Sequence, residues 1–208
     1  MFFWMYFTKL ADTNVMMPLA CLLAGWLAYW HCWRAAVRWL LLFGAGLTIV
    51  VASKIAYIGW GLGIASLDFR GFSGHAMRAA AVAPVFFLLA VQSRARTITA
   101  ASLLAAVAFA IAIGVSRLIL HQHSLSEVIG GLALGGAIAA WVLSVERSTR
   151  SLPWNPAVAT GCILIIVVGM AARPAPTERW IEKIALYLSG HDRPYPHPAR
   201  RAALLPSP

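Results

Sequence analysis

Charged residues are scarce in this sequence, and acidic ones are the scarcest. The 208 residues include seven Asp and Glu against 17 Lys and Arg, and charged residues make up 12% of the chain. A soluble domain holds about 25% charged and about 45–50% apolar residues, whereas apolar and aromatic residues reach 61% here. These proportions exclude a disordered chain, a coiled coil and an ordinary soluble enzyme.

Cysteine is also scarce, and no pair of cysteines has metal-binding spacing. Cys21, Cys32 and Cys162 lie in or beside apolar segments, without a C-x-x-C motif. We expect them to be small buried hydrophobic side chains rather than disulfides or ligands. The spacing of His, Cys, Asp and Glu matches no zinc or iron pattern, so the sequence predicts no metal and no other cofactor.

Long apolar runs are what the sequence has in abundance. Each run is close to the roughly 20 residues that cross a bilayer as a helix, and each is apolar all round. The runs cover about 14–33, 37–60, 75–91, 98–118, 125–145 and 156–172. They predict an all-α, polytopic membrane helix bundle of about six transmembrane helices, forming one membrane domain over residues 1–172. Gly131 and Gly135, in the fifth run, predict close helix packing inside this bundle rather than a dimer contact.

Residues 173–208 differ from the rest, because they form a proline-rich tail. Within it, residues 178–189 have the pattern of one short helix ending at Gly190. Trp180, Ile181, Ile184 and Leu188 would share one face of that helix. We expect this helix to lie on the membrane surface.

The net charge of +10 points to lipid partners rather than nucleic acid, because no run of basic residues is present. We expect the bilayer and phosphate-bearing lipids as partners, and nothing in the sequence specifies an oligomeric state. One set of loops is rich in arginine, which is typical of the cytoplasmic face. These arginines are Arg34, Arg38, Arg94, Arg96, Arg147 and Arg150. The opposite face would then look outward, into the periplasm of a bacterial inner membrane.

Ionisable residues inside or beside the apolar runs gather near that opposite face. Even-numbered helices end where odd-numbered helices from the third onward begin, so two separate connections meet at one level. Charged residues in lipid are costly and are functional candidates by default. The set is Lys54, Asp68, Arg70, His75, Arg78, Arg117, His121, His123 and Glu127.

The spacing of His123 and Glu127 has a chemical consequence. Residues four apart lie on one face of a helix. A carboxylate that binds one imidazole nitrogen fixes the tautomer and leaves the other nitrogen free to attack. Arg117, six residues before His123, offers a planar fork that suits phosphate oxygens. His121 falls on a different face, and we interpret it as structural.

Ser73, Gly74 and His75 open the third apolar run and form a second candidate segment. Ser73 can act as N-cap, Gly74 permits close backbone approach, and the helix N-terminus attracts anions. His75 would protonate a leaving oxygen, and Lys54 adds a point charge. Together the two segments indicate phosphoryl transfer through a phosphohistidine on His123, with cations and amides supplying charge stabilisation without a metal.

These residues resemble the motifs of the type 2 phosphatidic acid phosphatase family, related to the vanadium haloperoxidases. The family pattern is K-x6-R-P, then P-S-G-H, then S-R-x5-H-x3-D. Ser116, Arg117 and His123 match the third motif at full spacing, with Glu127 where the family has Asp. The second motif matches except that Phe72 replaces Pro. Only Lys54 of the first motif is present, because Gly61 and Leu62 stand in place of Arg-Pro.

The resemblance implies a six-helix core and a role for each matching residue. It implies that His123 is the nucleophile, Glu127 its orienting partner and His75 the general acid. It implies phosphate binding by Lys54, Ser73, Gly74 and Arg117. Arg70 is our candidate for the missing first-motif arginine and Arg78 a weaker one; the alternative for both is a head-group cation. Asp68 would pair with one of them.

The resemblance also implies an enzyme that removes phosphate from a membrane lipid. The substrates expected from the family are undecaprenyl diphosphate, phosphatidylglycerophosphate, phosphatidic acid and lipid A phosphates. Two alternatives stay open from the sequence: a lipid phosphotransferase, and a non-catalytic relative that binds lipid.

Overall fold

The computed structural model describes residues 1–90, 96–145 and 156–195, and within them the regular structure is helical, with no strand. The described residues form eight α-helices, with 3₁₀ turns at Lys9–Ala11 and Ala65–Leu67. The α-helices are α1 Phe2–Thr8, α2 Thr13–Tyr29, α3 Trp33–Trp60, α4 Gly74–Ala90, α5 Arg96–Ile119, α6 Leu125–Val145, α7 Pro156–Ala171 and α8 Thr177–Ser189.

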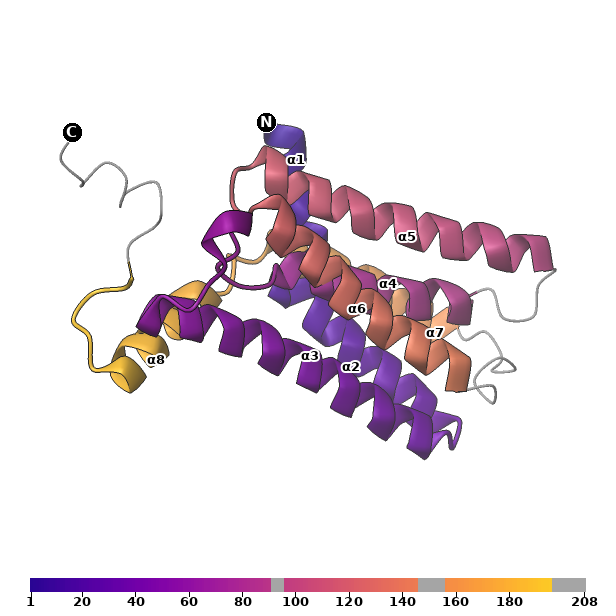
Figure 1. The fold of residues 1–208 in the computed structure, drawn as a ribbon. Coiled ribbons are helices and arrows are strands. Elements are labelled where there is room, and N and C mark those ends of the chain that lie inside the picture. The colour runs from indigo at the N-terminus through magenta and orange to yellow at the C-terminus, as the bar shows by residue number, and fades with distance from the viewer. Residues whose placement is uncertain (91–95, 146–155, 196–208) are drawn as a thin grey trace.

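Helices α2 to α7 form one bundle (Figure 1). In the part of the chain that the structure describes, four apolar helical stretches are long enough to cross a membrane, and two shorter apolar helices lie among them. The four are Phe2–Tyr29, Trp33–Trp60, Ile98–Ile119 and Leu125–Ser144, and the two are Gly74–Leu88 and Pro156–Ala171. The expected all-α polytopic membrane bundle is therefore confirmed. The first span is longer than the sequence indicated, because α1 and the Lys9–Ala11 turn extend α2 toward the N-terminus.

Helix α4 is the central helix of the bundle, with most of its first three turns buried. It packs closely on α6 because that helix presents glycines. A Cβ atom at Gly131 would lie 2.6 Å from the Ser73 carbonyl oxygen, and one at Gly135 would overlap the Met77 carbonyl. The expected role of these glycines in packing within the bundle is confirmed.

The cysteines differ from expectation in part: Cys162 is buried, Cys32 is half-buried and Cys21 is exposed.

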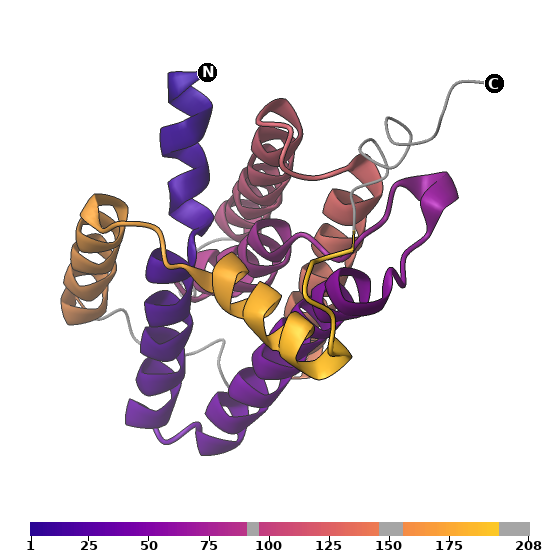
Figure 2. The same cartoon turned by 90° about the vertical axis from the view of Figure 1, so that its left-hand side faces the viewer.

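Three connections meet at one end of the bundle: residues 61–73, 120–124 and 172–176. Figures 1 and 2 show these connections at the same end of the bundle, and the polar residues singled out above lie in them or in the adjoining helix turns. At the other end, Arg34 and Arg38 lie exposed in the first two turns of α3. Arg94, Arg147 and Arg150, and the side chain of Arg96, lie outside the described residues. The orientation in the membrane stays a prediction.

Helix α8 lies across the polar end of the bundle (Figure 2). It packs on α3 through Ile181 and Ala185, which are buried, and the Ala185 carbonyl lies against Gly59. Trp180, Ile184 and Leu188 are exposed. The four apolar residues expected on one face are therefore divided, since Ile181 faces α3 and the others face outward. The tail from residue 196 lies outside the described residues.

Candidate active site

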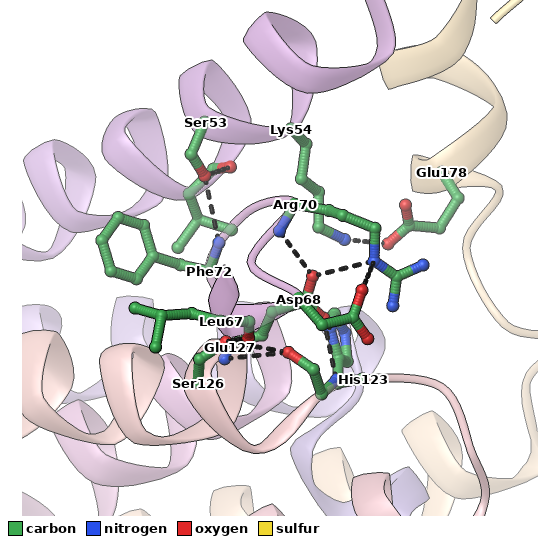
Figure 3. Close-up of polar contacts among 12 residues, drawn as sticks. Ser53, Lys54, Leu67, Asp68, Arg70, Phe72, His123, Ser126, Glu127 and Glu178 are labelled. Carbon is green, nitrogen blue, oxygen red and sulfur yellow. Dashed lines mark hydrogen bonds and ion pairs between the residues drawn. The ribbon is translucent and has the colours of Figure 1, made fainter. Parts of the chain in front are cut away.

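The turn between α5 and α6 brings His123 onto Glu127. His121 adopts a left-handed backbone (φ 52°) that ends α5, and its side chain is exposed. Glu127 lies in the first turn of α6, where the helix dipole favours a carboxylate. Its Oε2 is 2.7 Å from His123 Nδ1 and also accepts the Ser124 backbone N–H at 3.1 Å (Figure 3). The carboxylate thus fixes the orientation of the imidazole through Nδ1, and the second ring nitrogen, Nε2, takes no part in this contact.

Arg70 comes from the connection between α3 and α4 and meets the other oxygen of Glu127. Its backbone N–H donates to Glu127 Oε1 at 3.0 Å, and its Nε lies 3.4 Å from the same oxygen. Asp68 Oδ1 is 3.8 Å from Arg70 Nε, so Asp68 pairs with Arg70 of the two arginines considered. Arg78 is directed elsewhere: it is buried and donates from Nε and Nη2 to the Ala11 carbonyl.

A cavity of about 210 Å³ opens beside this pair. Four of the eight candidate residues line it: Lys54, Arg70, His123 and Glu127. We call these four the cavity group. The ammonium of Lys54, from the C-terminal part of α3, forms an ion pair with Glu178 of α8, which also lines the cavity (Figure 3). The cavity wall therefore joins residues from α3, α6, α8 and two connections.

The other four candidates, Ser73, Gly74, His75 and Arg117, do not line this cavity. We call them the inner group. Ser73 is fully buried, and its backbone N–H donates to the Glu127 carbonyl at 3.0 Å. It precedes Gly74, the first residue of α4, but its hydroxyl has no hydrogen-bond partner among the described residues. The expected side-chain cap is therefore not made, and the hydroxyl is left for another partner.

The N-terminal segment supplies contacts to the rest of the inner group. Asp12 Oδ2 lies 3.8 Å from His75 Nε2, and Asp12 Oδ1 accepts the Asn14 N–H in the first turn of α2. Arg117 donates from Nη1 to the Thr8 hydroxyl at 3.2 Å, while its buried Nε has no partner among the described residues. A buried donor without a partner is costly, so Ser73 and Arg117 retain hydrogen-bonding capacity that an anionic ligand could satisfy.

The sequence interpretation missed Thr8, Asp12 and Glu178 as neighbours of the site. One of the three carries a local signal: Asp12 stands directly before an apolar run, which is typical of a helix N-cap. That signal predicts the start of α2 and says nothing of His75. Thr8 and Glu178 carry no local signal, because helix packing alone brings them to the site.

The electrostatics of the site favour a neutral His123. Burial lowers the pKa of His123, and the charges of Lys54 and Arg117 lower it further, although the hydrogen bond to Glu127 opposes them. A neutral imidazole held by a carboxylate is a nucleophile at neutral pH. Among the residues that the structure describes, no group of three or more His, Cys, Asp or Glu side chains could hold a metal ion.

Comparisons with known proteins identify the family of this chain. A family model described as "PAP2 superfamily" matches residues 64–150, which include the Arg70–Glu127 part of the site. The chain is 34% identical over 198 residues to a protein of Klebsiella pneumoniae named "Uncharacterized 22.5 kDa protein in cps region", covering 92% of this chain and 94% of the relative. No solved structure matches the chain. The chain belongs to the PAP2 superfamily, a phosphatase-type superfamily. This is the type 2 phosphatidic acid phosphatase family that its motifs resemble.

Proposed function

We propose that this protein hydrolyses a phosphomonoester or diphosphate lipid through a phosphohistidine on His123. The observation that carries the proposal is the 2.7 Å contact between His123 Nδ1 and Glu127 Oε2 at the wall of a cavity with two cationic side chains. A positioned imidazole supplies a nucleophile, and the cations stabilise the charge of the transferred phosphoryl group.

In the proposed ground state the phosphate lies between the cavity group and the inner group. Lys54 and Arg70 approach it from the cavity. Arg70 takes the part of the absent first-motif arginine, which its place next to Glu127 supports. The Ser73 hydroxyl, the amides that open α4 at Gly74, and Arg117 would approach it from the inner side.

The reaction then has two steps. His123 Nε2 attacks phosphorus, a P–N bond forms, and the P–O bond to the lipid breaks while His75 gives a proton to the leaving oxygen. Water next attacks phosphorus, the P–N bond breaks, and the water proton returns to His75. Glu127 stabilises the imidazolium that develops on His123. Asp12, whose Oδ2 lies 3.8 Å from His75 Nε2, would stabilise a protonated His75 in this reaction. The lysine, arginines and amides provide the charge stabilisation, so the proposed reaction needs no metal.

The proposed substrate is a phosphorylated lipid that reaches the site from the bilayer. The candidates are undecaprenyl diphosphate, phosphatidylglycerophosphate, phosphatidic acid and a lipid A phosphate. The membrane bundle supports a lipid rather than a soluble phosphate ester, since the site lies at the ends of apolar helices. Arg34 and Arg38 at the opposite end support a site that faces the periplasm of an inner membrane.

The proposal is tested by phosphate release from these four lipids with purified protein in detergent and EDTA. We expect release from at least one of them, and its loss in His123→Ala. A ³²P label retained on wild-type protein after acid-free quenching, and absent from His123→Ala, would identify the intermediate. Undiminished release from His123→Ala would contradict the assigned nucleophile. A strict requirement for Mg²⁺ would contradict the metal-free reaction.

A further inference from the structure

One carboxylate of the site has no place in the proposed reaction: Glu178, at the start of α8. It forms an ion pair with Lys54, a phosphate-binding candidate, and it lines the same cavity as His123 and Arg70 (Figure 3). A carboxylate is an unexpected group in a pocket proposed to bind phosphate, because both are negatively charged. Here the carboxylate pairs with Lys54, the cation that an incoming phosphate would otherwise bind.

Two features keep Glu178 over the pocket. Helix α8 is held on α3 by the buried side chains of Ile181 and Ala185. The close approach of Ala185 and Ser189 to Gly59, which has no side chain, lets the two helices touch. The carboxylate is therefore presented to the pocket by the packing of α8, one turn before the first packed residue.

The charges around Glu178 are those that would surround a phosphate. Partial loss of solvent raises the pKa of Glu178, but the charges of Lys54 and Arg117 oppose this, and the pKa is below its ordinary value. Glu178 is thus ionised at neutral pH and lies within electrostatic reach of both cations. Lys54 is largely buried, at 13% exposed, whereas the Glu178 side chain is 70% exposed. Such a carboxylate can leave Lys54 for solvent at little cost.

We propose that Glu178 is a built-in competitor for the phosphate position, so that a phosphorylated substrate must displace it from Lys54. This inference rests on the proposed function. A phosphate dianion attracts Lys54 and Arg70 more strongly than a single carboxylate does. Substrate held at the membrane therefore enters by displacing Glu178, whereas dilute free phosphate competes poorly. Helix α8 in this way weakens inhibition of the enzyme by its own product.

The test is the affinity for inorganic phosphate, measured by titration calorimetry in detergent, alongside KM and kcat for the lipid that is hydrolysed. Glu178→Gln removes the charge and keeps the shape. We expect it to bind phosphate about 1.5- to 5-fold more tightly, the range of a partly exposed ion pair, and to lower KM without lowering kcat. Glu178→Asp keeps the charge in the first turn of α8 but shortens its reach, and we expect an intermediate value.

Glu182→Gln is the matched control, because Glu182 is exposed one turn further along α8 and the charge change is the same. We expect wild-type phosphate affinity for it. Equal or weaker phosphate binding by Glu178→Gln than by wild type would overturn the inference, and so would a raised KM, which would make Glu178 a positioning residue for Lys54. Tighter phosphate binding by Glu178→Gln, without hydrolysis of any lipid by the wild-type protein, would overturn the proposed function. The inference that Glu178 competes with phosphate for Lys54 would still hold.

Discussion

The two halves of the site differ in how their polar groups are satisfied. In the cavity group, both oxygens of Glu127 are occupied and Lys54 is paired. Arg70 Nε makes no hydrogen bond among the described residues, but it lies 3.4 Å from Glu127 Oε1 as an ion pair. In the inner group, the Ser73 hydroxyl and Arg117 Nε are buried without partners among the described residues. The cavity group holds the proposed nucleophile, His123, already in contact with its proposed supporting carboxylate, Glu127. The other half holds unmet hydrogen-bonding capacity, which an anion would satisfy.

The largest expected effect is on the organised half. Glu127→Gln removes the charge that orients and stabilises His123, and we expect kcat to fall by about 10³- to 10⁴-fold, as when the orienting carboxylate of a His-based triad is neutralised. Glu127→Asp keeps the charge, and we expect a smaller loss. Steady-state hydrolysis of the preferred lipid measures both. Equal losses in the two variants would mean that arm length, not charge, is the important property.

His75→Ala tests the inner half. Loss of a general acid costs about 10²- to 10⁴-fold in kcat with a lipid alcohol as leaving group. We expect a much smaller loss with a p-nitrophenyl phosphate, because that leaving group departs without protonation. Both substrates are compared on the same protein preparation. A loss of the same size on each would assign His75 to binding rather than to proton transfer.

Arg70→Ala and Arg117→Ala compare one arginine from each half. Each removes a charge-assisted contact to phosphate, so we expect kcat/KM to fall by about 10- to 200-fold, the equivalent of about 1.5–3 kcal/mol. Arg78→Ala is the comparison variant, since Arg78 bonds the Ala11 carbonyl and not the cavity. Near-normal kcat/KM for Arg70→Ala would end its assignment as the replacement arginine.

Gly131→Ala tests how the two halves are held together. A Cβ atom there would lie 2.6 Å from the Ser73 carbonyl oxygen and 3.2 Å from Ala76 Cβ, so α4 and α6 must separate. We expect a loss of about 1–3 kcal/mol in stability, seen as a lower Tm in detergent, with a modest loss of activity. Gly136→Ala is the control, because no atom lies within 4 Å of the added carbon. A Tm equal to that of the control would mean that this packing is looser than the structure indicates.

The smallest effect is a shift along the pH axis. Burial, Lys54 and Arg117 lower the pKa of His123, and activity is lost when His123 becomes protonated as the pH falls. We therefore expect the acid limb of kcat/KM to lie below about pH 6.5, the ordinary value for histidine. Lys54→Gln should move the limb up and Glu127→Gln should move it down, because the two charges act on His123 in opposite directions. Movement of both in one direction would contradict this account.

The sequence by itself was enough for the features that depend on local spacing or composition. Six apolar runs predicted the bundle, and the helix starts that the structure has lie within two residues of those expected for α4, α5, α6 and α7. The contact between His123 and Glu127 was expected from their spacing of four on one helix face. The structure makes it in another way: His123 precedes α6, which begins at Leu125, and Glu127 folds back over the helix N-terminus to the Ser124 N–H and the imidazole. The pairing of Asp68 with an arginine was predicted without deciding between Arg70 and Arg78.

Tertiary structure decided the rest, because it joined residues that are far apart in the chain. Arg70 and Glu127 are 57 positions apart, Thr8 and Arg117 are 109 apart, and Lys54 and Glu178 are 124 apart. Helices that are apolar on all sides carry no pattern that tells which face meets which neighbour. The sequence therefore determined which residues could do the chemistry and at which end of the bundle they lie. Only the packing of α4 on α6 and of α8 on α3 decided which are exposed to the cavity, which stay behind it, and that a carboxylate covers Lys54.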